Sequence, residues 1–152
     1  MNLAIGSDHA GFNLKEAIRL YFERREHYFV DCGTFDPFER VDYPDYAKKV
    51  CETVLSGEAS FGILVCGTGI GMSIAANKFA GIRAALAYFP DMAKLARAHN
   101  NANIIALGGR VMGEELAIWC VESFINTDFD GGRHQLRVEK LEANVGDKVV
   151  FD

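Results

Sequence analysis

The chain has 152 residues, of which 49% are hydrophobic and 24% are charged, and its formal net charge is −5 at pH 7. This length and composition predict a single domain, residues 1–152, of an ordinary soluble globular protein. The negative charge argues against nucleic acid or an anionic membrane as the main partner, so an anionic ligand would have to be held by clustered arginines.

Hydrophobic runs and turn residues predict strands that alternate with helices along the chain. We expect strands at residues 3–6, 28–31, 61–66, 83–88 and 103–107. Helices are expected around residues 14–22, 42–56, 72–78, 90–99 and 114–125, with a last helix from about residue 132. This alternation indicates an α/β fold, in which a five-stranded parallel sheet carries helices on both faces.

Apolar periodicity also predicts which faces of the helices are buried. Met92, Leu95, Ala96 and His99 follow the spacing i, i+3, i+4, i+7, which places His99 on the packed face of its helix. A satisfied core histidine is as compatible with that position as a functional one. Two other helices are expected to bury these residues: Ile74, Ala75 and Ala76 in one, and Leu116, Trp119, Cys120 and Phe124 in the other.

The most informative stretch is FGILVCGTGIGMSIAANK at residues 61–78. An apolar strand ends at Cys66, a turn containing Gly67, Gly69 and Gly71 follows, and a helix begins directly after it. Backbone N–H groups at such a helix start attract negative charge, so the turn is suited to a phosphate or an oxyanion. The same field stabilises a thiolate at Cys66. The stretch therefore combines a candidate base or nucleophile with an oxyanion hole.

Other interpretations of this turn were weighed. The dinucleotide-binding fingerprint is G-x-G-x-x-G, whereas this turn reads G-x-G-x-G and comes after the third predicted strand. The Walker pattern G-x-x-x-x-G-K-[ST] is absent. A plain connecting turn beside a buried, inert cysteine remains open, because free cysteines are often buried.

Several polar residues follow predicted strands and should therefore share one edge of the sheet. Asp8 and His9 follow the first strand, Thr68 follows the third, and Arg110 follows the fifth. Ligands of open α/β sheets bind at this edge. Simpler roles also exist, since Asp8 can cap the next helix and His9 can be a solvated loop residue.

The last predicted helix carries Arg133 and Arg137, which lie four residues apart and so on one helical face. Two guanidinium groups in this arrangement suit a phosphate. The ordinary alternative is an exposed face paired with Glu139 or Glu142.

No secretion signal is recognisable, because residues 1–6 run directly into a strand without a basic leader. The four cysteines show neither CxxC pairing nor zinc-ligand spacing. We therefore expect reduced thiols in the cytoplasm. Residues 59–77 carry no charge, but their three glycines and interspersed polar residues argue against a membrane-spanning helix.

A set of motifs resembles one known family along most of the chain, from residue 3 to about residue 142. The motifs are SDHAGF at 7–12, DYP at 42–44, CGTGIG at 66–71, AANK at 75–78, GIR at 81–83, HN at 99–100 and GGRH at 131–134. Together they closely resemble the type B ribose-5-phosphate isomerases, which are relatives of the galactose-6-phosphate isomerase subunits. The extension at residues 143–152 has no role that this resemblance assigns.

The resemblance implies a Rossmann-like three-layer sandwich, a homodimer that can pair into a tetramer, active sites between two subunits, and aldose–ketose isomerisation without a metal or other cofactor. It implies that Cys66 is the base that moves the proton between C2 and C1. His99, helped by Thr68, would open the furanose ring. The remaining implied roles are sugar-hydroxyl contacts for Asp8 and Tyr43, enediolate binding for Gly67, Gly69, Ile70, Gly71 and Asn100, and phosphate binding for His9, Arg110, Arg133 and Arg137 with His134 nearby.

Three functional alternatives stay open from the sequence. A hexose-6-phosphate isomerase would use the same chemistry, and loops such as 34–42 would set the pocket size. A non-catalytic phosphosugar-binding module would keep the glycine turn and the arginines but would not need Cys66. A thiol-redox role is disfavoured, since no resolving cysteine lies near Cys66 in the sequence. The last helix, which follows a glycine linker, is expected to pack on a second subunit.

Overall fold

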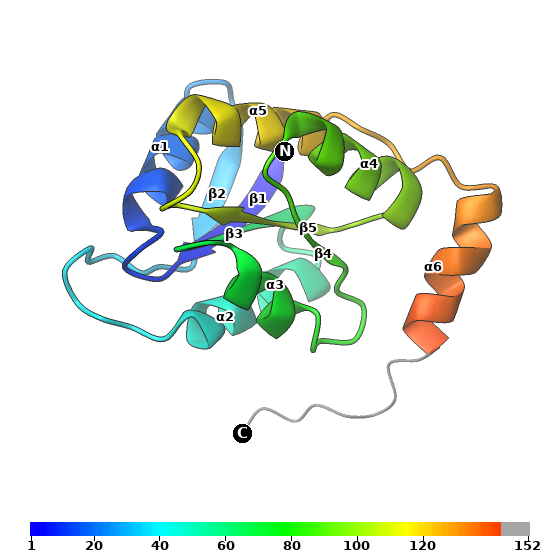
Figure 1. The fold of residues 1–152 in the computed structure, drawn as a ribbon, viewed down its shortest axis with the longest axis horizontal. Helices are drawn as coiled ribbons and strands as arrows, with labels where there is room; N and C mark the ends of the chain where they lie inside the picture. Colours follow the sequence, from blue (N-terminus) through cyan, green and yellow to red (C-terminus); the bar gives the residue numbers. More distant parts are fainter. Residues whose placement is uncertain (144–152) are drawn as a thin grey trace.

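The computed structural model describes residues 1–143 (Figure 1). Its centre is one parallel sheet with the strand order β2-β1-β3-β5-β4. The strands are β1 (Asn2–Ser7), β2 (Tyr28–Asp31), β3 (Phe61–Cys66), β4 (Ala84–Leu86) and β5 (Ile104–Gly108). The helices are α1 (Phe12–Glu23), α2 (Tyr43–Leu55), α3 (Ile70–Ala76), α4 (Pro90–Asn100), α5 (Glu114–Ile125) and α6 (Arg133–Ala143). The predicted five-stranded α/β fold is confirmed.

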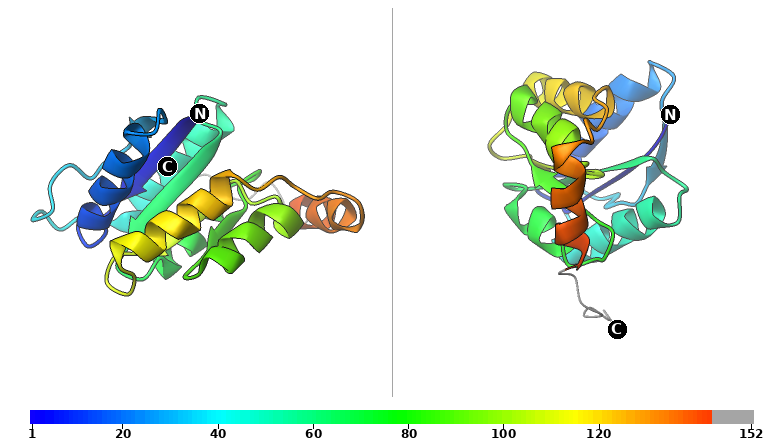
Figure 2. Two further views of the ribbon diagram at one scale, coloured as in Figure 1. Left: turned by 90° about the horizontal axis from the view of Figure 1, so that it is seen from above. Right: turned by 90° about the vertical axis from the view of Figure 1, so that its right-hand side faces the viewer.

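Helices cover both faces of the sheet and make three layers. α1, α5 and α4 lie side by side on one face, while α2 and α3 pack together on the other (Figures 1 and 2). α6 stands apart from both layers, beyond the end of α4 (Figure 1). The extension predicted after residue 143 lies outside the described residues. Among residues 1–143, none of the helices has the length and apolar character needed to cross a bilayer.

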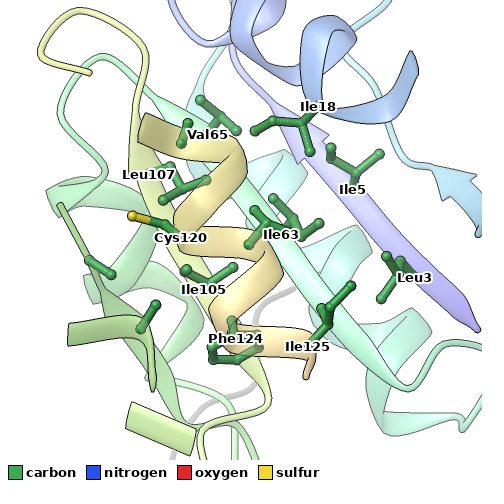
Figure 3. Packing of buried hydrophobic residues seen from close by; sticks show 14 of the residues in the cluster. Leu3, Ile5, Ile18, Ile63, Val65, Ile105, Leu107, Cys120, Phe124 and Ile125 are labelled. Atoms are coloured by element: carbon green, nitrogen blue, oxygen red, sulfur yellow. The ribbon is translucent and has the colours of Figure 1, made fainter. Parts of the chain in front are cut away.

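Two apolar cores flank the sheet because successive strand residues point to opposite faces. Ile63 and Val65 of β3 join Phe124 of α5 in the larger core, shown in Figure 3. Leu64 points the other way, toward Val50 of α2 and Met72 of α3. The central strands are buried on both faces, which explains why β3 and β5 read as unbroken apolar runs.

The predictions of buried helix faces were right for Ala76, Ala96, Cys120 and Phe124 but wrong for four larger apolar side chains, which are exposed. Met92 and Leu95 of α4 are 43% and 48% exposed, because the small side chains of Ala93 and of the correctly predicted Ala96 pack inward. Trp119 of α5 and Ile74 of α3 are also exposed. Each of these helices is apolar on more than one face, so periodicity alone did not select the face that packs.

A buried ion pair fixes the start of the loop between β2 and α2. Lys15 is fully buried, and its Nζ donates to Asp31 Oδ1 and Oδ2 at 2.9 and 2.8 Å and to Glu16 Oε1 at 2.8 Å. Asp31 Oδ1 also accepts the N–H of Gly33 at 3.0 Å. The carbonyl of Gly33 in turn accepts the N–H of Ser7 at 2.6 Å. Lys15 thus ties α1 to the end of β2 and to the first residues of the loop that follows it.

The same cluster predicts an acid-sensitive contribution to stability. Hydrogen bonds from Arg19 and then Lys15 hold the pKa of Glu16 at about 2, below its ordinary value of 4.5. This stabilisation is complete above the unfolded-state pKa and is lost as the pH falls from about 4.5 toward 2. Urea unfolding at a series of pH values should show this loss. Glu16→Gln should make the free energy of unfolding depend less on pH in that range. Glu58→Gln, at an exposed carboxyl, should leave that dependence as steep as in the wild type.

Candidate active site

The carboxyl ends of β1, β3 and β5 bring three short loops together. Asp8 and His9 follow β1, the turn from Gly67 to Gly71 follows β3, and Arg110 follows β5. The chain reverses its direction across the sheet between β1 and β3, which is where ligands bind in open α/β folds. These residues lie at one edge of the sheet, as predicted.

Cys66 ends β3 and is 4% exposed. Its Sγ accepts the N–H of Gly69 at 3.1 Å, and its carbonyl accepts the N–H of Gly109 at 2.8 Å. Gly69 has a φ of +82°, and a Cβ there would lie 2.7 Å from Leu86 Cδ1. Glycine is therefore required both by the backbone conformation and by the packing. An N–H directed at the sulfur stabilises negative charge on it.

The other three thiols have surroundings that favour the protonated form. Burial raises the pKa of Cys51 to about 12 and that of Cys120 to about 11. Burial also raises the pKa of Cys32, whose sulfur lies near the carbonyl oxygen of Val30. These thiols are inert at neutral pH. The position of Cys66 at the edge of the sheet, with a backbone donor on its sulfur, distinguishes it from them.

Three side chains contact the glycine turn, those of Thr68, Tyr88 and Tyr43. Thr68 Oγ1 accepts the N–H of Ile70 at 3.2 Å, and the Thr68 carbonyl accepts the hydroxyl of Tyr88 at 2.7 Å. The ring of Tyr43 lies directly over Gly71, where a Cβ would come within 2.6 Å of Tyr43 Cζ. Tyr88 was missed in the sequence, although its place just after β4 put it at the same edge.

Asp8 and His9 are held by backbone groups. Asp8 is 7% exposed, and its Oδ1 accepts the N–H of Gly11 at 3.0 Å, so it closes the turn before α1 and does not cap the helix itself. His9 Nδ1 accepts the N–H of Val41 at 3.2 Å. A neutral His9 therefore carries its proton on Nε2. This bond also ties the loop 34–42 to the site.

Arg110 lies against the turn that follows Cys66. Its N–H donates to the carbonyl of Gly67 at 2.9 Å, and a Cβ on Gly67 would lie 3.2 Å from Arg110 Nη1. The guanidinium is exposed and makes no ion pair with any of residues 1–143. It is available to an anion bound in front of the turn.

The remaining predicted site residues lie at the opposite edge of the sheet. In a parallel fold the helix after a strand runs back toward the amino edge, so α4 and α5 both end there. His99 and Asn100 end α4, and Arg133, His134 and Arg137 lie on α6 beyond it (Figure 1). One chain thus divides the predicted residues into a carboxyl-edge group and an amino-edge group.

His99 belongs to a small polar cluster at the amino edge. Its side chain is 40% exposed, which rules out the satisfied core histidine. Its ring stacks on His134 with 4.2 Å between centroids and 9° between planes, and its Nε2 lies 3.8 Å from Asp130 Oδ2. Burial lowers the pKa of His134, and His99, Arg133 and Arg137 lower it further.

Arg133 and Arg137 are exposed on α6. The two carboxylates expected to neutralise them have other partners. Glu139 accepts a hydrogen bond from Gln135, and Glu142 forms an ion pair with Arg83. Within residues 1–143, neither arginine forms an ion pair. The paired-surface alternative is therefore wrong, and both guanidinium groups are left for an external anion.

A hollow of about 450 Å³ lies between β4 and α6, at the amino edge. Asn100, Arg83 and Glu142 line it, while none of the carboxyl-edge residues does. Its lining is mostly apolar or already paired, so size alone does not mark the reactive site. The converging donors and the thiol around Cys66 make that turn the stronger candidate site on chemical grounds.

Comparison with known proteins points to one family. The sequence model of the ribose/galactose isomerase family matches residues 3–141. Ribose-5-phosphate isomerase B of Escherichia coli is 49% identical over 141 residues, which cover 93% of this chain and 94% of the relative. Ribose-5-P isomerase B of Listeria innocua is 41% identical over 142 residues, covering 93% and 95%.

Solved structures give the same result. The ribose 5-phosphate isomerase of Thermotoga maritima superposes with a TM-score of 0.92 at 58% identity, covering 93% of this chain and 97% of that one. The type B ribose 5-phosphate isomerase of Trypanosoma brucei superposes with a TM-score of 0.89 at 48% identity, covering 93% and 97%. The chain belongs to the ribose/galactose isomerase family.

Proposed function

We propose that this protein is an aldose–ketose isomerase that interconverts D-ribose 5-phosphate and D-ribulose 5-phosphate through an enediolate. The observation that carries the proposal is the buried Cys66 sulfur, which accepts the Gly69 N–H at the meeting point of three site loops. Relatives that cover almost the whole chain are ribose-5-phosphate isomerases by name.

The reaction needs one base and a set of donors for the oxygen that gains charge. Cys66, as a thiolate, takes the proton from C2 and returns it to C1. The oxygen of the enediolate is stabilised by backbone N–H groups of the turn from Gly67 to Gly71 and by Asn100. Asp8 and Tyr43 bind sugar hydroxyls, and His99 with Thr68 opens the furanose ring. No step requires a metal.

The phosphate is the part of the substrate that holds it in place. Arg110, Arg133 and Arg137 supply the positive charge, with His9 and His134 beside them. Their guanidinium groups are exposed and lack carboxylate partners among residues 1–143. An anchor remote from C1 and C2 fixes the orientation of the reacting carbons and so lowers the barrier.

These roles require two copies of the chain, because the two groups of residues lie at opposite edges of one sheet. We propose a two-fold symmetric homodimer in which the amino-edge group of one copy faces the Cys66 turn of the other. The exposed apolar side chains of α4 and α6, namely Met92, Leu95, Leu136 and Leu141, support an interface there. Pairing of dimers into a tetramer is compatible with this arrangement.

The chain acts as one domain in this proposal, and its place is the cytoplasm. All four cysteines are free. Reduced thiols are the ordinary state in that compartment and are required for Cys66 to act as a base.

The experiment that tests the function is turnover of ribose 5-phosphate by purified protein, with allose 6-phosphate as the comparison. We expect turnover of the pentose phosphate, and faster turnover of the hexose phosphate would make the protein a hexose-6-phosphate isomerase. Binding of both sugars without turnover would indicate the phosphosugar-binding module instead. The loop 34–42, with Phe35 and Phe38 71% and 91% exposed, is the first segment to exchange if the preference is for the larger sugar.

Arg137→Ala tests the phosphate role. Loss of one charge-assisted contact should raise the KM for ribose 5-phosphate by roughly tenfold or more, because such bonds contribute about 1.5–3 kcal/mol. The turnover number should fall less than kcat/KM. Lys140→Ala, on the same helix, serves as the control for a general loss of positive charge. Equal KM values for Arg137→Ala and the wild type would remove Arg137 from the phosphate site.

A further inference from the structure

Three metal-ligating side chains converge where α4, the glycine linker and α6 meet. His99, Asp130 and His134 each offer one ligand atom, and these atoms all lie within 4.8 Å of one another. His99 ends α4, whereas Asp130 and His134 lie four residues apart, so the fold brings together two segments that are distant in the sequence. The donor set is two imidazole nitrogens and one carboxylate oxygen.

Backbone hydrogen bonds build this cluster. The N–H of Asp130 donates to the carbonyl of Ala98 at 2.9 Å, which fixes the linker beside the end of α4. The N–H of His134 donates to the carbonyl of Gly131 at 3.0 Å. Gly131 and Gly132 have φ values of +64° and +55°, so the chain turns sharply between Asp130 and α6. The side chains are therefore held in a defined place.

His134 is the member that points to a ligand. The residue is 7% exposed, yet its ring makes no hydrogen bond with any of residues 1–143. Its nitrogens are not among the fully buried polar atoms that lack a partner, which within residues 1–143 are Ser7 Oγ and His27 Nδ1, so they are open to a ligand that enters from solvent. Coordination uses the neutral ring, which keeps a lone pair on one nitrogen.

We propose that His99, Asp130 and His134 form a binding site for a divalent cation of the Zn²⁺, Co²⁺ and Ni²⁺ class. Imidazole and carboxylate ligands suit these ions, and water completes the coordination. Ligand atoms around tetrahedral zinc lie roughly 3.3 Å apart, from bonds of about 2.0–2.1 Å. The cluster must therefore contract by up to about 1.5 Å on binding. Asp130 and His99 have side chains 58% and 40% exposed, so both have room to close on the ion.

The surrounding charges narrow the class of ion. The positive charges of Arg133 and Arg137 lower the pKa of His134, and the negative charge of Asp130 raises it. A hard cation held only by charge, such as Mg²⁺ or Ca²⁺, is disfavoured beside two arginines and gains little from imidazole. Ions that form strong bonds to nitrogen are favoured in spite of those charges.

The consequence is inhibition, and this part rests on the proposed function. A bound ion occupies the ring nitrogens of His99 and His134 and prevents ring opening and phosphate binding. Asp130 has no part in the proposed isomerisation. It is thus the residue through which cation binding can be separated from catalysis.

The first experiment is a Co²⁺ titration of the purified protein without substrate, followed by visible absorption. We expect one Co²⁺ per chain with the absorption of a nitrogen- and oxygen-ligated ion. Asp130→Asn should weaken binding by roughly tenfold or more, and His134→Ala should abolish it. Asp128→Asn is the matched control at a neighbouring acid, and Cys66→Ala excludes binding through that thiol. Failure to bind Co²⁺, or equal binding by Asp130→Asn, would overturn the site.

The second experiment measures turnover of ribose 5-phosphate in Zn²⁺. Zn²⁺ should inhibit the wild type competitively, and EDTA should restore its activity. Asp130→Asn should keep its basal activity and need roughly tenfold more Zn²⁺ for the same inhibition. Inhibition at equal Zn²⁺ in both proteins would overturn the regulatory role. Because the Co²⁺ titration uses no substrate, failure of the isomerase activity and failure of the cation site are told apart.

Discussion

Cys66→Ala should leave a folded protein whose kcat for ribose 5-phosphate is lower by about 10²–10⁴-fold, the usual contribution of a general base. The sulfur is the group at the end of β3 that accepts the Gly69 N–H, and alanine removes it without adding bulk to the turn. The KM should change little, because the proposed phosphate contacts are untouched. Stopped-time assays of ribulose 5-phosphate formation measure this directly.

Cys32→Ala is the matched control for that experiment. Its thiol is partly buried beside Thr53 and the carbonyl of Val30, and burial raises its pKa. Activity within about twofold of the wild type is expected, since surface-proximal changes away from special features have small effects. Circular dichroism and the melting temperature establish that both variants fold. Full activity of a folded Cys66→Ala protein would place the base elsewhere.

Mixing two inactive variants should restore activity if the site spans two subunits. Cys66→Ala alters the carboxyl-edge group and His99→Ala alters the amino-edge group, so a mixed dimer has one site with both changes and one with neither. Random re-association of equal amounts makes about half of the dimers mixed, and the mixture should recover about one quarter of wild-type activity. Subunits are exchanged by joint refolding from urea, and turnover is then assayed.

The same-edge mixture is the decisive control. Cys66→Ala and Thr68→Ala both alter the Gly67 turn, so every site of their mixed dimer carries one of the two changes. No recovery above the parent variants is expected. Recovery in both mixtures, or in neither, would contradict the division of the site between subunits. Parent variants refolded alone provide the baseline.

The sequence revealed the local features of the fold and of the site. The bounds of β3 were predicted as they are found, because a buried strand followed by a glycine turn is encoded within a few residues. Asp8, His9, Cys66, Thr68 and Arg110 were placed at one edge by the simple rule that carboxyl ends of parallel strands coincide.

What the sequence did not reveal depends on how whole helices pack. Ala93 and Ala96 are buried while Met92 and Leu95 are exposed, although all four are apolar, and only contact with α5 selects which of them pack inward. The same uncertainty put His99 on the wrong face. The sequence also could not show that Arg137 lacks a carboxylate partner among residues 1–143. This follows from the ion pair that Glu142 forms with Arg83, a residue distant in the sequence.

The distance between the two edges of the sheet makes turnover depend on dimer formation under the proposed arrangement. Under the proposed arrangement a single folded chain holds only half of the reactive groups that each site needs. Turnover then begins at assembly and not at folding, and it follows the concentration of the protein as steeply as dimer formation does. Dilution below the dissociation constant of the dimer would abolish turnover without denaturing the chain, and raising the protein concentration would restore turnover.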